Sequence, residues 1–192
     1  MNGYTKAGRP KGTYRKARLI SEREFNSVIQ FLEESNGIHK NRNICILLLN
    51  FHLGIKAIDL CLLKASDVFN GKEILGGLCI RKTEPIVHIR LDKKLRFALD
   101  LYVKQRIEEE GGSFHTDFIL FKSQKNNFSS ATLVPLIKKI YHDAGFPGVT
   151  SHSGKGAFMK KQVEMHQDIK TVGKMISDVS MNVRRYVTKY TK

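Results

Sequence analysis

Apolar residues at helical spacing limit the fold of this chain more than any other feature. Ser21 and Glu24 make a capping-box pattern ahead of one such run, so a helix should begin there. Asp92 is placed to cap a longer run that reaches Glu110, where Gly111-Gly112 should end the helix. The inward positions of the two helices are Phe25, Val28, Ile29 and Leu32, then Leu95, Leu99, Val103 and Ile107. The chain is therefore predicted to be mainly helical.

Further helices are predicted between and after these two. A helix from about Lys40 carries the very apolar run 44–49, which is too short to span a bilayer, and it should end at Gly54. A short helix is expected from Ile58 to Leu63. Later helices are expected over Leu133 to Ala144, with Pro135 in the first turn, and over roughly 153–166 and 168–176.

Two strand-like segments interrupt the helices. The segments Ile74 to Arg81 and Pro85 to Leu91 fit a hairpin with one solvent-exposed face, and Lys82 lies at its turn. The predicted fold class is thus α+β, mainly helical, with a small antiparallel sheet. A chain of 192 residues with 41% hydrophobic content is enough for one globular domain, which we place at residues 21–192.

Basic residues dominate the charge and gather at the amino terminus. The net charge of +15 favours a polyanionic partner, usually nucleic acid. Residues 1–20 form a predicted disordered arm, expected to contact DNA through Lys6, Arg9, Lys11, Arg15, Lys16 and Arg18. Gly8-Arg9-Pro10-Lys11 resembles the AT-hook, so the arm either enters the minor groove or acts as a plain electrostatic arm.

Cysteine usage and hydropathy narrow the remaining classes. Cys45, Cys61 and Cys79 are odd in number, lie among apolar neighbours and form no Cys-x-x-Cys pair, so we expect buried free thiols and no metal. The basic amino terminus lacks the apolar stretch of a signal peptide. We expect a cytoplasmic, nucleoid-associated protein without a membrane partner.

Three groups of residues, far apart in the chain, form a recognisable pattern. They are Gly54-Ile55-Lys56-Ala57-Ile58-Asp59-Leu60, then Ser151-His152-Ser153-Gly154-Lys155, and finally Tyr186. The pattern resembles the catalytic layout of the tyrosine recombinases, the phage-integrase family, over about residues 21–190. The resemblance implies a tyrosine-recombinase catalytic-domain fold and action on double-stranded DNA. It also implies that no metal or other cofactor is used.

The resemblance assigns a role to each matching residue. Tyr186 would attack a DNA phosphodiester, His152 would act as acid or base, and Lys82 would protonate the leaving 5′ oxygen. Lys56 and Lys155 would hold the non-bridging phosphate oxygens, with Asp59 as an orienting carboxylate and Arg184 and Arg185 as further DNA contacts. Taken singly, each residue has a plainer interpretation, namely a packed tyrosine, solvated lysines or a helix-end histidine. The functional interpretation depends on the joint pattern.

The chain departs from the family where chemistry is most demanding. Each of the first two motifs contains an arginine in the family, which we call a box arginine, and these two positions hold Lys56 and Lys155 here. A lysine places a single charge at the end of a flexible side chain, whereas arginine offers a planar guanidinium group with several donors. The family's histidine ahead of the tyrosine is replaced by either Ser177 or Asp178. Transition-state geometry should suffer more than DNA affinity.

These departures leave two main hypotheses and one less favoured. The first is a DNA-binding protein of the recombination and integration class whose strand cleavage is weakened or lost. The second is an active site-specific recombinase that forms a 3′-phosphotyrosyl intermediate through Tyr186. The third is RNA binding, which the charge alone permits. Self-association on DNA, or pairing with a related recombinase, is compatible with either of the first two.

Overall fold

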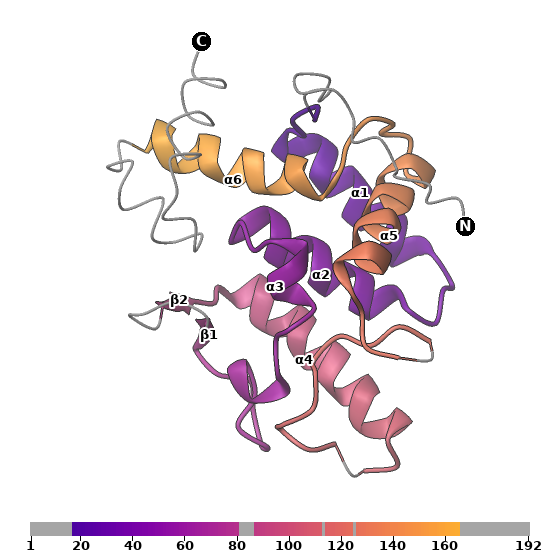
Figure 1. The fold of residues 1–192 in the computed structure, drawn as a ribbon, viewed down its shortest axis with the longest axis vertical. Helices are drawn as coiled ribbons and strands as arrows, with labels where there is room; N and C mark the ends of the chain where they lie inside the picture. The colour runs from indigo at the N-terminus through magenta and orange to yellow at the C-terminus, as the bar shows by residue number, and fades with distance from the viewer. Residues whose placement is uncertain (1–16, 81–86, 113, 125, 166–192) are drawn as a thin grey trace, which may run out of the picture.

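The computed structural model describes residues 17–80, 87–112, 114–124 and 126–165, and the predicted fold class is confirmed there (Figure 1). The structure is mainly helical with one small antiparallel sheet. In chain order the elements are α1 Glu22–Glu34, α2 Lys40–His52, α3 Ala57–Leu60, the 3-10 turn η1 Ala65–Asp67, β1 Gly77–Ile80, β2 Val87–Arg90, α4 Lys93–Glu109, α5 Ser130–Asp143 and α6 Ser151–Glu164.

Helix α2 lies at the centre of the core. It packs against α1, α4 and α6 (Figure 1). Every residue from Ile44 to Phe51 is buried. The ring of Phe51 stacks on Phe25 of α1 with 3.9 Å between ring centroids. Burial on all sides explains why the apolar run of this helix shows no single hydrophobic face.

The two predicted helix caps are confirmed. The Ser21 hydroxyl accepts a hydrogen bond from the Glu24 amide, and the Glu24 carboxylate accepts one from the Ser21 amide. Asp92 Oδ1 accepts a hydrogen bond from the Leu95 amide at 2.8 Å. These bonds satisfy amides that the first turn of a helix would otherwise leave without partners, and they fix where α1 and α4 begin.

The hairpin is shorter than predicted. Gly77 pairs with Arg90 and Leu78 with Ile89, and buried Leu78 turns one face of the pair toward the core. Ile74 forms an isolated antiparallel bridge with Phe69 instead of joining β1. The predicted first strand therefore began too early, because its first residues close a local turn. Lys82 and Pro85 lie outside the described residues.

Three helix boundaries also differ from the prediction. Helix α3 covers only Ala57–Leu60, because the chain leaves it to pair Leu63 O with the Leu120 amide at 2.7 Å. Helix α5 begins at Ser130, so Pro135 falls in its second turn and not in the first. Helix α6 begins at Ser151, where Thr150 supplies the cap. The side-chain cap at Thr150 explains the early start of α6.

The cysteine prediction holds for two of the three side chains. Cys45 and Cys61 are buried, whereas Cys79 is half-buried. Burial raises the pKa of the Cys45 thiol. In the described part of the chain no group of three or more acidic, histidine or cysteine side chains could hold a metal ion, and no helix there is long and apolar enough to cross a membrane.

The capping box of α1 gives a direct test of local stability. We expect Ser21→Ala to lower the free energy of unfolding by about 1 kcal/mol, because the Glu24 amide loses its acceptor. Ser27→Ala is the matched control, since Ser27 lies inside the same helix and is exposed, and it should change stability by less than about 0.5 kcal/mol. Urea unfolding of both variants measures the difference, and equal losses would contradict the role of the cap.

Candidate functional site

Lys56 lies at the junction between α2 and α3. Gly54 has a φ of 66°, a conformation that favours glycine, and it lets the chain turn sharply after α2. The Leu49 carbonyl accepts hydrogen bonds from the amides of Leu53 at 3.2 Å and Ile55 at 3.4 Å. Lys56 then occupies the cap position of α3 and is half-buried. The backbone that carries this lysine is thus fixed by the end of the central helix.

His152 and Lys155 lie in the first turns of α6. Thr150 caps the helix by accepting a hydrogen bond from the His152 amide at 3.2 Å, and the Thr150 amide donates to Ser153 Oγ at 2.9 Å. Ser151, Ser153 and Lys155 are buried, with Lys155 only 6% exposed, while His152 is exposed. The amino end of α6 therefore presents the histidine outward and holds the lysine within the structure.

Asn50 joins the two lysine-bearing segments. Its Nδ2 atom donates a 2.8 Å hydrogen bond to the carbonyl of Ile55, the residue before Lys56. A Cβ atom added to Gly154, the residue before Lys155, would lie only 2.2 Å from Asn50 Oδ1. One fully buried side chain in α2 thus touches the backbone next to each lysine. This geometry brings together two sequence motifs that are about a hundred residues apart.

Sequence reasoning missed Asn50. It follows directly on the apolar run of α2, and a polar residue on a helix that is otherwise buried was the available signal. Its Oδ1 atom has no hydrogen-bond partner among the described residues.

The acid-base character of His152 is shifted by its surroundings. Partial burial of the ring lowers the pKa of this imidazole below its ordinary value, and the nearby Lys155 ammonium lowers it further. Both effects favour the neutral ring, because each makes the charged form less stable. His152 is therefore mainly neutral at pH 7 and can accept a proton.

A hollow of about 210 Å³ lies between the end of α2, β2 and α6. Its lining includes Arg90 from the hairpin and Lys161 from α6, with Asp92 and His52 beside them. Lys161 also pairs with Glu22 at 3.6 Å. Sequence reasoning did not single out Arg90 or Lys161, because only the fold brings these two cations to one hollow.

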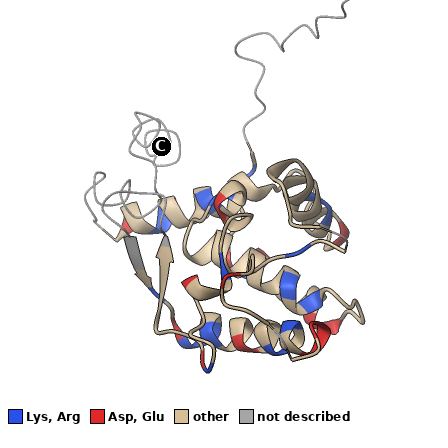
Figure 2. Cartoon of the chain, turned by 60° about the horizontal axis from the view of Figure 1, so that its bottom comes forward, with Lys and Arg blue, Asp and Glu red and all other residues tan. Residues whose placement is uncertain are grey.

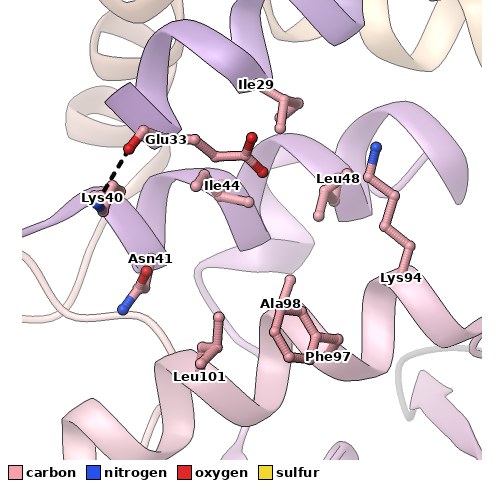
Figure 3. Close-up of a pocket in the computed structure, with 10 residues that line it drawn as sticks. All are labelled: Ile29, Glu33, Lys40, Asn41, Ile44, Leu48, Lys94, Phe97, Ala98 and Leu101. Atoms are coloured by element: carbon pink, nitrogen blue, oxygen red, sulfur yellow. Dashed lines mark hydrogen bonds between the residues drawn. The ribbon is translucent and has the colours of Figure 1, made fainter. Parts of the chain in front are cut away.

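A second pocket, of about 250 Å³, lies between α1, α2 and α4 (Figure 3). Its walls are mostly apolar and include Ile44, Leu48 and Phe97. The charged residues Glu33, Lys40 and Lys94 also line it, and Lys40 Nζ donates a hydrogen bond to the Glu33 carbonyl at 3.2 Å. The predicted site residues do not line this pocket.

Several predicted site residues lie outside the described part of the chain. They are the nucleophile candidate Tyr186, the hairpin lysine Lys82, the substituted positions Ser177 and Asp178, and the DNA-contact candidates Lys6, Arg9, Lys11, Arg15, Lys16, Arg184 and Arg185. Asp59, by contrast, lies half-buried in α3, three residues after Lys56. The structure thus places four of the predicted site residues, Lys56, Asp59, His152 and Lys155, on α6 and around α3.

Charge on the described surface is spread over many elements. Lysine and arginine occur on each of the long helices, and acidic residues occur on all of these helices except α2 (Figure 2). Arg18, a predicted DNA contact, forms an ion pair with Glu24 of α1. Ile20, at the end of the predicted arm, is buried in the core. The folded structure therefore already includes the last residues of that arm.

Comparison with known proteins agrees with this architecture. The chain is 28% identical over 153 residues to the tyrosine recombinase XerA of Pyrococcus horikoshii, an alignment that covers 78% of this chain and 51% of the relative. The chain thus spans about half the length of this curated relative. No family model matches the sequence.

Solved structures show the same fold. A crystal structure of XerA recombinase superposes with a TM-score of 0.71 at 20% identity, covering 93% of this chain and 61% of that one. The Tn1549 transposon integrase in complex with transposon right end DNA gives 0.70 at 12% identity, covering 93% and 62%. An arginine-to-lysine variant of that integrase, in complex with a circular intermediate DNA, gives 0.67 at 13% identity, covering 93% and 62%.

This chain therefore has the fold of a tyrosine recombinase catalytic domain, and the predicted resemblance to the tyrosine recombinases is confirmed.

The electrostatic link within α6 can be measured directly. We expect Lys155→Met to raise the pKa of His152, because the substitution removes the ammonium group that disfavours the charged imidazole. Nuclear magnetic resonance titration of the ring measures the change, and a His152→Gln variant assigns the signal. Lys160→Met, on the same helix, is the control and should leave this pKa unchanged. An unaltered pKa in Lys155→Met would mean that burial alone lowers it.

Proposed function

We propose that this protein binds duplex DNA through a tyrosine-recombinase domain in which strand cleavage is weakened or lost. The observation that carries the proposal is the presence of Lys56 and Lys155 at the two box positions. The buried side chain of Asn50 contacts the residue before each of these lysines. Both lysines keep the positive charge that phosphate binding needs. Neither provides the planar pair of donors that arginine offers to two phosphate oxygens.

The expected loss of cleavage follows from what each donor contributes. Removing one preorganised donor from a transition-state site typically costs about 10²–10³ in rate, and two such losses would cost about 10⁴ or more, although coupled sites do not add simply. Binding to the ground-state phosphate depends mainly on charge and is affected less. DNA affinity should therefore survive where catalysis does not.

The structural relatives support duplex DNA as the partner. The Tn1549 integrase is seen with transposon right end DNA, and its arginine-to-lysine variant is seen with a circular intermediate DNA. In that protein such a substitution is thus compatible with a DNA complex. Together with the charge of +15, this favours a DNA-binding role in recombination or integration.

Other cations would extend the phosphate-binding surface. Arg90 and Lys161 line one hollow beside α6, and the arm residues 1–16 add a run of basic side chains. In this proposal the arm follows the DNA backbone, while Arg184 and Arg185 add contacts near Tyr186. The protein acts without a cofactor as an accessory or regulatory factor of a mobile element, on the nucleoid, and assembles on DNA with itself or with a related recombinase.

The alternative is an active recombinase in which Lys56 and Lys155 hold the phosphate oxygens during cleavage. It is favoured by the retained His152, whose lowered pKa keeps the ring ready to accept a proton. In that case Tyr186 would form the covalent phosphotyrosyl link, and Lys82 would protonate the leaving oxygen.

Binding tests the proposed partner. We expect the affinity for random duplex DNA to fall steeply with salt, at a slope of about −0.9 for each phosphate contact, and to exceed the affinity for duplex RNA of the same length. Fluorescence anisotropy at several salt concentrations measures both quantities. Deleting residues 1–16 should flatten the slope, because this segment carries five of the six basic residues of the arm. A clear preference for RNA would overturn the assignment to DNA.

Covalent trapping separates the two recombinase hypotheses. On a nicked suicide duplex we expect little covalent adduct from the native chain, and at least about a hundredfold faster formation from the combined Lys56→Arg and Lys155→Arg variant. Tyr186→Phe in that variant is the control and should abolish the adduct. Rapid, Tyr186-dependent trapping by the native chain would favour the active enzyme instead.

A further inference from the structure

We propose that Asn50 is a positioning residue that holds the segments of Lys56 and Lys155 together as one phosphate-binding unit. The inference rests on the proposed function, since it concerns how the two lysines act on the same DNA. Asn50 itself is fully buried and touches the backbone beside each lysine, so it acts through them and not on the phosphate.

The first half of the contact fixes Lys56. The Asn50 side-chain amide donates to the Ile55 carbonyl at 2.8 Å, at the point where the chain turns from α2 into α3. The carbonyl of Lys56 in turn accepts hydrogen bonds from the amides of Asp59 and Leu60, each at 3.0 Å, and these bonds form the first turn of α3. The bond from Asn50 thus holds Ile55, the residue directly before the cap position of this helix.

The second half of the contact fixes α6. Helices α2 and α6 approach so closely at Asn50 that Gly154 has no space for a Cβ atom, which would lie 2.2 Å from Oδ1 and 3.1 Å from Cγ. With any larger residue at position 154, either the Asn50 side chain would leave its place beside Ile55 or α6 would move away from α2. A glycine facing an asparagine therefore sets the separation of the two lysine segments.

The chemistry of Asn50 argues against a role in packing alone. Its Oδ1 atom is buried and accepts no hydrogen bond from the described residues. An unpartnered acceptor in a core is costly, and a leucine of the same branched shape would avoid that cost. Leucine could not donate to the Ile55 carbonyl, however. The side-chain donor is thus what asparagine supplies here and leucine would lack, and it acts on the Lys56 segment.

A positioning contact matters more when lysines, and not arginines, bind the phosphate. An arginine fork orients itself by bonding two oxygens at once, whereas a lysine makes no such paired contact. The relative position of two lysines must then come from the backbone that carries them. The Asn50 contacts supply that constraint from one side chain.

The salt dependence of duplex binding tests the inference. We expect Asn50→Ala, although it changes a neutral and buried residue, to reduce the magnitude of the slope of log affinity against log salt by roughly 1 to 2, as if one or two phosphate contacts were lost. Lys56→Met with Lys155→Met should reduce it by a similar amount, and adding Asn50→Ala to that pair should produce no further change. A purely structural residue would lower the melting temperature without altering the slope.

The matched control lies on the same helix. Asn41→Ala removes an asparagine of α2 that bonds Gln105 of α4 at 3.2 Å, far along the helix from both lysines, and it should leave the slope unchanged. If Asn50→Ala alone does not fold, the double variant Asn50→Ala with Gly154→Ala is tested instead. In that variant the new Cβ atom at position 154 can occupy the space left by the asparagine side chain. The inference would be overturned if a folded Asn50 variant kept the salt slope of the native chain while the double-lysine variant showed a reduced slope.

Hydrogen exchange gives a readout that does not depend on DNA. In Asn50→Ala we expect the amides of Asp59 and Leu60 to exchange at least about tenfold faster, because their acceptor at Lys56 is no longer anchored. The same amides should keep their rates in Asn41→Ala. Unchanged exchange in Asn50→Ala would overturn the inference even if the protein binds DNA. Failure of the parent to bind duplex, with faster exchange in Asn50→Ala, would overturn the proposed function and leave the positioning contact in place.

Discussion

The burial of α2 is the constraint on which the rest of the structure depends. This helix packs against α1, α4 and α6, and its residues from Ile44 to Phe51 form the middle of the core. Because protein interiors are close-packed, the elements around it have little freedom to shift. The position of α2 therefore sets where its own last residues turn toward α3 and where α6 crosses it.

The candidate site is attached directly to that helix. The turn at Gly54 carries Lys56 out of the end of α2, and the crossing at Gly154 brings Lys155 to the side of it. His152 lies one turn before Lys155, near enough for the ammonium group to lower the pKa of the ring. A site built on the most buried helix is rigid, which suits a task in which charges must face a phosphate group at fixed positions.

Replacing arginine by lysine separates affinity from chemistry at such a site. In the function that we propose, the charge that attracts DNA is retained, while the paired hydrogen bonds that would stabilise a developing transition state are lost. The chain has the fold of a recombinase catalytic domain and spans about half the length of its curated relative, and its two box positions hold lysines. These facts together make binding with weakened cleavage the function that we favour.

The sequence alone determined the elements with strong local signals. The capping box at Ser21, the cap at Asp92 and the apolar spacing between them predicted α1, α2 and α4, because caps and periodicity act over a few residues. The ends of α3 and β1 were misjudged, since Leu63 and Ile74 pair with Leu120 and Phe69 by contacts that no local pattern announces. Only the tertiary structure decided that Asn50 touches both lysine segments, because that contact requires α2 and α6, a hundred residues apart, to cross at a glycine.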